Sequence, residues 1–357
     1  MTSTNHRRTY RQYLENGAVQ MLYQPIIDLR TGKLYSVEAL ARLQGPRGQL
    51  IAPIEFLPGF GNAALLRLFR IGLQQICRDM RMWCEENPHL NLAVGINLPP
   101  DGLTQDAYRD SIFEGMSVWG LPAGLLELEM LEGKESLDIA KRDARIAEFQ
   151  QAGIRIVQDD LGSGHSSLLR MDRIPCDRVK IDQGLVRSAL DRPIRALEFI
   201  YHLTRLAHDF GVLVTVEGLE DEGLIEAAAI LGADQGQGFG IARPMAAHDV
   251  MSWHQTWSMP VEPERPRTAL GALAGFLLWD RKLGMMVDWP DHAADFIKEP
   301  YLVHRYLEHH GTSDPDLSVM LESTQIIALH GQRSHRYIQI REELVGRLST
   351  IWLRERN

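Results

Sequence analysis

The chain has 357 residues, a formal net charge of −9 and 45% hydrophobic residues, which fits a water-soluble protein of one large domain plus a smaller one, or of two medium ones. The acidic balance argues against a nucleic-acid polymer or an anionic membrane surface as the main partner. The three cysteines lack metal-ligand spacing, no apolar signal core follows the start, and no apolar segment is long enough to span a bilayer. We therefore expect a cytoplasmic protein with free thiols.

Strands and helices alternate in the first half of the chain. Two apolar segments, 18–27 and 34–43, flank a turn at 28–32, which predicts a hairpin. The second segment carries Glu38 among apolar residues, where a carboxylate needs an ion-pair partner, such as Arg42, or a bound cation. The next expected elements are a helix over 64–86, strands over 90–98 and 125–131, and a helix over 136–152.

The alternation continues to residue 238. A β-branched strand from residue 154 leads to the pair Asp159-Asp160, and a loop with two glycines follows. The remaining elements are strands over 176–181, 212–216 and 233–238 and helices over 193–210 and 223–231. This order indicates a parallel sheet, and about eight strands in roughly 250 residues favour a closed barrel. The absence of a Gly-rich dinucleotide fingerprint in the first unit weakens a Rossmann interpretation.

Polar side chains recur near the ends of these strands. They are Glu38, Asn97, Glu129, Asp159, Asp160, Lys180, Glu217 and Gln237. The carboxyl ends of barrel strands converge on one mouth, where so many carboxylates need cations between them. Oxygen ligands favour Mg²⁺ or Mn²⁺ over zinc. The alternative is a set of unrelated polar strand ends, with Asp159-Asp160 as a solvated turn.

In these motifs the sequence resembles the EAL family of bacterial cyclic di-GMP phosphodiesterases. The order and spacing agree over about residues 8 to 250. The matching motifs are Tyr23-Gln24-Pro25-Ile26, Glu38-Ala39-Leu40 with Arg42, Asn97 before Pro99-Pro100, Leu128-Glu129-Met130-Leu131-Glu132, Asp159-Asp160-Leu161-Gly162-Ser163-Gly164, Lys180-Ile181-Asp182, Glu217-Gly218-Leu219-Glu220, and Gln237-Gly238 with Pro244.

The resemblance implies a modified TIM (β/α)8 barrel with one antiparallel strand. It also implies hydrolysis of cyclic di-GMP to linear pGpG by a water that two Mg²⁺ or Mn²⁺ ions activate. Lys180 is expected to orient that water and to support negative charge in the transition state. The implied metal ligands are Glu38, Asn97, Glu129 and Asp159 for the first ion, and Asp159, Asp160 and Glu217 for the second.

The same resemblance implies substrate contacts and a control loop. The residues expected at the substrate are Gln24, Leu40, Arg42 and Gln237. Glu132 is expected to anchor the loop 161–167, which in the family couples dimerisation to metal binding, so a homodimer is predicted. The sequence departs from the family at Leu43, at 59–62, at Leu161 and at His165, but none of these departures removes a predicted metal ligand.

A Pro-rich, charged segment over 258–267 separates the predicted EAL barrel, residues 1–257, from a helical tail over 268–357. The tail is expected to be a small all-α regulatory or dimerisation domain. Its predicted helices cover 269–279, 292–309, 317–330 and 335–353. Six histidines of the tail could suggest zinc or haem, but no Cys or tight ligand motif accompanies them, which favours solvated or capping histidines.

Three functions are compatible with these patterns. The first is a metal-dependent cyclic di-GMP phosphodiesterase. The second is a catalytically silent receptor that binds cyclic di-GMP and signals through the helical tail. The third is a metallohydrolase for another phosphodiester. The complete set of carboxylate, Asn and Lys residues favours the first.

Overall fold

The computed structural model describes residues 3–130, 138–161, 174–187, 192–286, 288–310, 315–328 and 334–356. Nine strands form one sheet in the order β1-β9-β8-β7-β6-β5-β4-β2-β3, and β1 also pairs with β2, so eight strands close a barrel and β3 is an extra strand. The predicted modified TIM barrel is confirmed. The strands are β1 Val19–Asp28, β2 Leu34–Gln44, β3 Leu50–Ile51, β4 Ala93–Leu98, β5 Leu126–Met130, β6 Arg155–Leu161, β7 Arg178–Ile181, β8 Leu213–Val216 and β9 Gln235–Gly236.

The chain forms two compact units. The first comprises Met1–Asp28, Leu34–Lys180 and Ala242–Trp257, and the second comprises Leu29–Lys33, Ile181–Ile241 and Ser258–Asn357. The helices of the first unit are α1 Ser3–Glu15, α2 Pro53–Phe56, α3 Asn62–Glu86, α4 Asp106–Val118, α5 Ile139–Gln151 and α10 Ala247–Thr256, with short 3₁₀ turns at Leu57–Gly59, Pro100–Leu103 and Ala123–Leu125.

In the first unit the predicted hairpin is confirmed, because β1 and β2 pair antiparallel with Gln24 opposite Glu38. The neighbouring pairs β2–β4, β4–β5 and β5–β6 are all parallel. The apolar face of α3 covers β1, where the rings of Tyr23 and Trp83 meet edge to face at 4.9 Å. The Tyr23 hydroxyl donates to Asp79 at 2.7 Å, which satisfies both buried polar groups.

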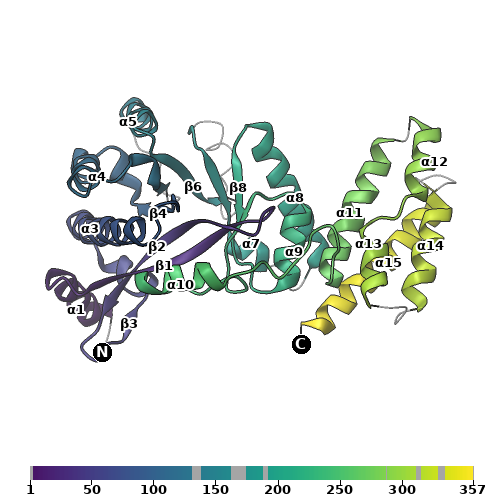
Figure 1. Ribbon diagram of the computed structural model, residues 1–357, viewed down its shortest axis with the longest axis horizontal. Coiled ribbons are helices and arrows are strands. Elements are labelled where there is room, and N and C mark those ends of the chain that lie inside the picture. Colours follow the sequence, from purple (N-terminus) through teal and green to yellow (C-terminus); the bar gives the residue numbers. More distant parts are fainter. Residues whose placement is uncertain are drawn as a thin grey trace. The chain divides into compact units, whose positions relative to one another are not determined.

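The second unit combines β8, β9 and the helices around them with the helical tail (Figure 1). Helix α11 packs against α9 and α15, and α14 packs against α15. The helices of this unit are α7 Gln183–Arg187, α8 Pro193–Asp209, α9 Glu222–Ile230, α11 Ala269–Met285, α12 Pro290–Lys298, α13 Leu302–His310, α14 Pro315–Ala328 and α15 His335–Glu355. Within the described residues, no helix has the length and apolar composition needed to cross a membrane.

One expectation for the helices was wrong, and α4 and α10 were not predicted. The helix predicted over 292–309 is two helices, α12 and α13, because Pro300 disfavours helical backbone at Glu299 and removes a backbone donor. The sequence analysis also missed α4, whose buried residues Tyr108, Ile112 and Met116 recur every four positions. That signal is sparse, and Gly115 lies inside the helix.

A buried carboxylate holds the start of the tail on the barrel. Glu226 of α9 is fully buried and accepts hydrogen bonds from the backbone N–H groups of Arg267 and Thr268, at 2.9 and 3.0 Å, and from the Thr268 hydroxyl at 2.6 Å. Thr268 in turn caps α11 by accepting from the Gly271 N–H at 3.0 Å. A Cβ atom at Gly271 would collide with the Glu226 carboxylate, so glycine is needed for this approach.

We expect Glu226→Ala to lower the free energy of unfolding by about 1 to 2 kcal/mol, because it leaves two partly buried N–H donors without this acceptor. Urea unfolding followed by circular dichroism measures the change. Glu222→Ala is the matched control, since Glu222 is exposed on the same helix, and we expect its effect to stay within about 0.5 kcal/mol. Equal losses in the two variants would contradict the anchoring role of Glu226.

Candidate active site

The centre of the candidate site is Lys180 on β7, which lies among three carboxylates. Its Nζ donates to Glu38 Oε2 at 2.9 Å and to Glu129 Oε2 at 3.0 Å, and it is 3.7 Å from Asp159 Oδ1. The side chain of Lys180 is only 1% exposed. A buried ammonium is stable when carboxylates surround it, so Lys180 and its partners compensate one another.

Strand register explains why these residues meet. Glu38 lies level with Gly95 of β4, and Asn97 of the same strand lies level with Glu129 of β5. The Asn97 amide donates to Glu38 Oε1 at 3.0 Å, so the second oxygen of that carboxylate is also bound. Three adjacent parallel strands therefore bring two carboxylates and an amide oxygen to one place in the barrel.

Glu129 is the most deeply buried ligand candidate. It is fully buried, and among the described residues its Oε1 atom has no hydrogen-bond partner. Burial raises the pKa of Glu129 well above its ordinary value; the nearby charges of Glu38 and Asp159 add to this shift, and Lys180 opposes it. Such a carboxylate gains stability from any further cation that reaches it.

Gly95 makes room for this carboxylate. A Cβ atom at residue 95 would collide with Glu129 Oε1, so only glycine leaves the carboxylate in its present position. Gly95 was not among the residues predicted for the site. It could have been noticed as a glycine inside a buried apolar strand, where glycine often allows another group to approach the backbone closely.

The donor set fits Mg²⁺ or Mn²⁺. Carboxylate and amide oxygens from Glu38, Asn97, Glu129 and Asp159 are the ligands these ions prefer, and the unpartnered Glu129 Oε1 is one available donor. In the part of the chain that the structure describes, no group of three or more His, Cys, Asp and Glu side chains is arranged to hold a metal. Lys180 engages the same oxygens, so an ion would compete with its ammonium.

A second ionic layer in the barrel is structural. Glu127 lies two residues before Glu129 on β5 and forms ion pairs with Arg178 and, at 3.0 Å, with Arg155. Both guanidinium groups also lie over the ring of Tyr35, at 5.4 and 5.5 Å from its centroid. Two arginines therefore neutralise Glu127, whereas Lys180 is the cation that bonds to Glu129.

A cavity of about 430 Å³ opens beside the carboxylate cluster. Glu38 and Asn97 are the polar side chains that line it, and Leu40 lines it as well. Most other lining residues are apolar, including Phe56 and Phe69. This combination of an apolar wall and a few polar groups is typical of a small-molecule site.

The other predicted substrate residues of the first unit lie on the β1–β2 hairpin. The Gln24 amide donates to the Ala242 carbonyl at 3.1 Å, and Arg42 donates to the Ala41 carbonyl at 2.9 Å. Burial lowers the pKa of Arg42, and the charge of Glu38 opposes that shift. Arg42 stays a cation at neutral pH, because the ordinary pKa of a guanidinium is so high.

Glu217 and Gln237 lie in the second unit, directly after β8 and β9. The Gln237 N–H donates to the Val216 carbonyl at 2.9 Å, and the Gln237 carbonyl accepts from the Leu219 N–H at 3.1 Å. The backbone therefore holds the two strand ends together. The predictions for the Asp160 side chain, Glu132, His165 and the loop 162–173 fall outside the described residues.

The chain is also similar to known proteins and to a known family of domains. The EAL domain model matches residues 7–244. The bifunctional diguanylate cyclase/cyclic di-GMP phosphodiesterase MucR of Pseudomonas aeruginosa is 30% identical over 246 residues, which are 68% of this chain and 35% of MucR. A cyclic di-GMP phosphodiesterase of the same species is 28% identical over 234 residues, or 65% of this chain and 39% of the relative.

Among solved structures, the complex of the Pseudomonas aeruginosa MucR phosphodiesterase with cyclic di-GMP matches with a TM-score of 0.62 and 29% identity, over 68% of this chain and 98% of that one. The chain spans about a third of the length of the curated relatives it matches. The family match covers well over half of the chain, and the barrel and its carboxylate cluster lie within it. This chain belongs to the EAL domain family.

Proposed function

We propose that this chain hydrolyses cyclic di-GMP to linear pGpG in the presence of Mg²⁺ or Mn²⁺. The observation that carries the proposal is the cluster of Glu38, Glu129 and Asp159 around the buried Lys180. The Asn97 amide joins this cluster through its hydrogen bond to Glu38. Two relatives, named for cyclic di-GMP phosphodiesterase activity, support the choice of substrate.

In this proposal the site residues have the following roles. Glu38, Asn97, Glu129 and Asp159 would hold the first ion, and Asp159, Asp160 and Glu217 would hold the second. Bound ions of this kind lower the pKa of a coordinated water and neutralise charge on a phosphoryl group.

Lys180 would hold that water in line with the phosphorus and donate to the oxygen on which negative charge develops. Arg42 would bind a phosphate or guanine of the substrate, and Gln24 would contact it from the neighbouring strand. Leu40 would line the substrate cavity, and Gln237 would support the site from another strand end. These roles require the Lys180 ammonium to move away from at least one carboxylate oxygen when an ion binds.

The wild-type chain should convert cyclic di-GMP to pGpG with Mg²⁺ or Mn²⁺, should lose this activity on chelation, and should regain it when the ion is returned. Separation of the two nucleotides by liquid chromatography measures turnover. Excess cyclic AMP and a linear dinucleotide serve as competitors, and strong inhibition by either would redirect the proposal to another phosphodiester. Absence of turnover with both ions, in the dimeric protein, would refute it.

A silent cyclic di-GMP receptor is the second candidate, and the direct contact of Lys180 with two carboxylates favours it. This function predicts saturable binding of cyclic di-GMP without formation of pGpG. A calorimetric titration beside the hydrolysis assay separates the two candidates. We further propose, from the family resemblance, a homodimer and a loop anchored by Glu132. The sparse cysteines suggest a cytoplasmic location, and the helical pattern of residues 268–357 suggests a regulatory or dimerisation role.

A further inference from the structure

The last turn of α15 contacts the loop that follows β8. Arg356 Nε is 3.2 Å from Asp221 Oδ2, and its Nη2 is 3.5 Å from Glu220 Oε2. On the other side, Arg187 Nε donates to Glu220 Oε1 at 3.1 Å. Glu220 therefore lies between a cation of the tail and a cation of α7, which follows the strand that carries Lys180.

The same turn is attached to three further helices. Trp352 is buried, and its indole packs against Gly223 at the start of α9. Glu355 accepts from the Ala269 N–H at the start of α11, at 3.1 Å, and from the Tyr306 hydroxyl of α13, at 3.0 Å. The turn is thus fixed to the frame of the tail as well as to the loop.

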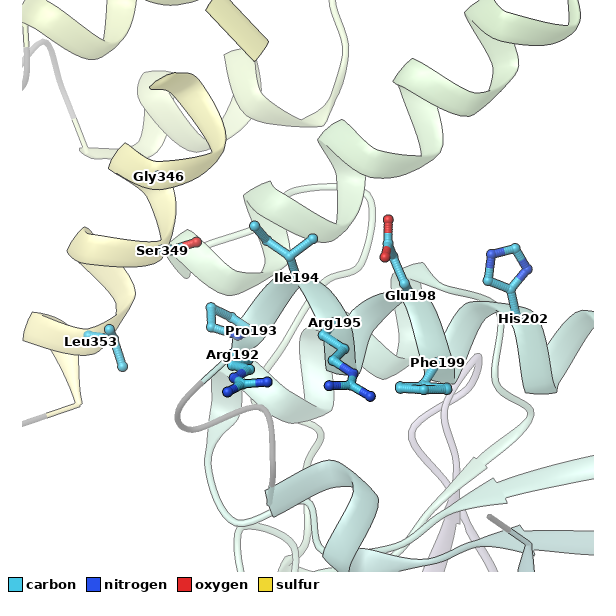
Figure 2. A pocket seen from close by; sticks show the side chains of 10 residues that line it. All are labelled: Arg192, Pro193, Ile194, Arg195, Glu198, Phe199, His202, Gly346, Ser349 and Leu353. Atoms are coloured by element: carbon cyan, nitrogen blue, oxygen red, sulfur yellow. The ribbon is translucent and has the colours of Figure 1, made fainter. Parts of the chain in front are cut away.

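One side of α15, from Gly346 to Leu353, faces a pocket. This pocket of about 810 Å³ separates α15 from α8, with Gly346, Ser349 and Leu353 of α15 on one side and Ile194 and Phe199 among the α8 residues on the other (Figure 2). The contacts of this helix with the loop after β8 and with the start of α9 come from its C-terminal end, through Arg356 and Trp352.

Backbone hydrogen bonds and closely packed glycines hold the loop after β8 in place. The Leu219 N–H donates to the Gln237 carbonyl at 3.1 Å, and the Leu219 carbonyl accepts from the Gly240 N–H at 2.8 Å. A Cβ atom at Gly238 would collide with the Leu219 backbone, and Gly218 has a φ of +70°. Backbone hydrogen bonds therefore hold Leu219, which lies between Glu217 and Glu220 in this one short loop.

We propose that the last turn of α15, through Arg356, positions Glu217 and thereby couples the helical tail to divalent-cation binding. Arg356 acts through Glu220 and Asp221, so it is a positioning residue and not a catalytic one. The inference rests on the proposed function, in which Glu217 is a ligand of the second ion. In this proposal the helical tail helps to set the position of a ligand of the second ion.

The test uses the full chain and three variants. Arg356→Gln removes the charge, Arg356→Lys keeps it, and Arg354→Gln is the matched control because Arg354 is exposed in the same turn. Mn²⁺ titrations, followed by the electron paramagnetic resonance signal of the free ion, should give about two- to fivefold weaker binding for Arg356→Gln. We expect partial recovery in Arg356→Lys and no change in Arg354→Gln.

A second readout follows from the reciprocity of coupling. In the wild type, saturating Mn²⁺ should slow amide hydrogen exchange in residues 350–356, and Arg356→Gln should lose that slowing. Equal Mn²⁺ affinities in wild type and Arg356→Gln, or the same exchange response in both, would overturn the coupling alone. A wild type that binds no Mn²⁺ would overturn both the coupling and the proposed function.

Discussion

Replacing Lys180 with methionine is expected to abolish turnover and to destabilise the metal-free protein by about 3 kcal/mol. The ammonium is 1% exposed and bonds to Glu38 and Glu129, so its removal leaves buried carboxylates facing one another without a positive charge. Methionine has a similar length and fills the space, which separates the loss of charge from the loss of packing. Urea unfolding without metal and the hydrolysis assay measure the two effects.

The same variant tests the competition between Lys180 and the ion. Mn²⁺ should stabilise Lys180→Met more than it stabilises the wild type, because in the variant no ammonium has to be displaced from the carboxylates. Lys33→Met is the control: Lys33 is exposed, and we expect neither its stability nor its turnover to change. Retained turnover in Lys180→Met would refute the catalytic role. Unchanged metal-free stability would refute its role as the compensating charge.

The barrel was predictable because its local signals agree with one another. Six of the eight barrel strands, all except β5 and β9, contain β-branched residues, and Gly, Pro or acidic residues mark most strand ends. β3 was missed because it has only two residues, Leu50 and Ile51, which is too short for any periodicity. The helix break at Pro300 could have been predicted from the proline itself. The apolar pattern on both sides of it led instead to the prediction of one continuous helix.

The candidate site was predictable in its membership and less so in its contacts. Glu38, Asn97, Glu129, Asp159 and Lys180 could be placed at one mouth because parallel strands end on the same side of a barrel. That Lys180 bonds directly to two of the carboxylates depends on strand register, which a sequence without its pairing partners does not contain. Gly95 contributes to the site because its lack of a side chain leaves room for the Glu129 carboxylate.

Gly95 gives the sharpest test of that register. Its neighbour across the β4–β5 pair is Glu127, and Glu129 lies two residues further on, level with Asn97. The Glu129 carboxylate bends back over Gly95, into the space that a Cβ atom would occupy. Any larger residue at position 95 must therefore displace the carboxylate, although it adds no charge and removes no ligand.

Gly95→Ala is accordingly expected to lower turnover by at least about a hundredfold and to weaken Mn²⁺ binding, with misplacement of Glu129 as the cause. Gly115→Ala is the matched control, because there the added methyl group lies at ordinary contact distance, 3.4 Å from Leu73 and 3.5 Å from Cys77. Thermal unfolding should show that both variants fold. If Gly95→Ala kept wild-type turnover and Mn²⁺ affinity, then Glu129 could not act from its present position, and the first-ion ligand set would have to be redrawn.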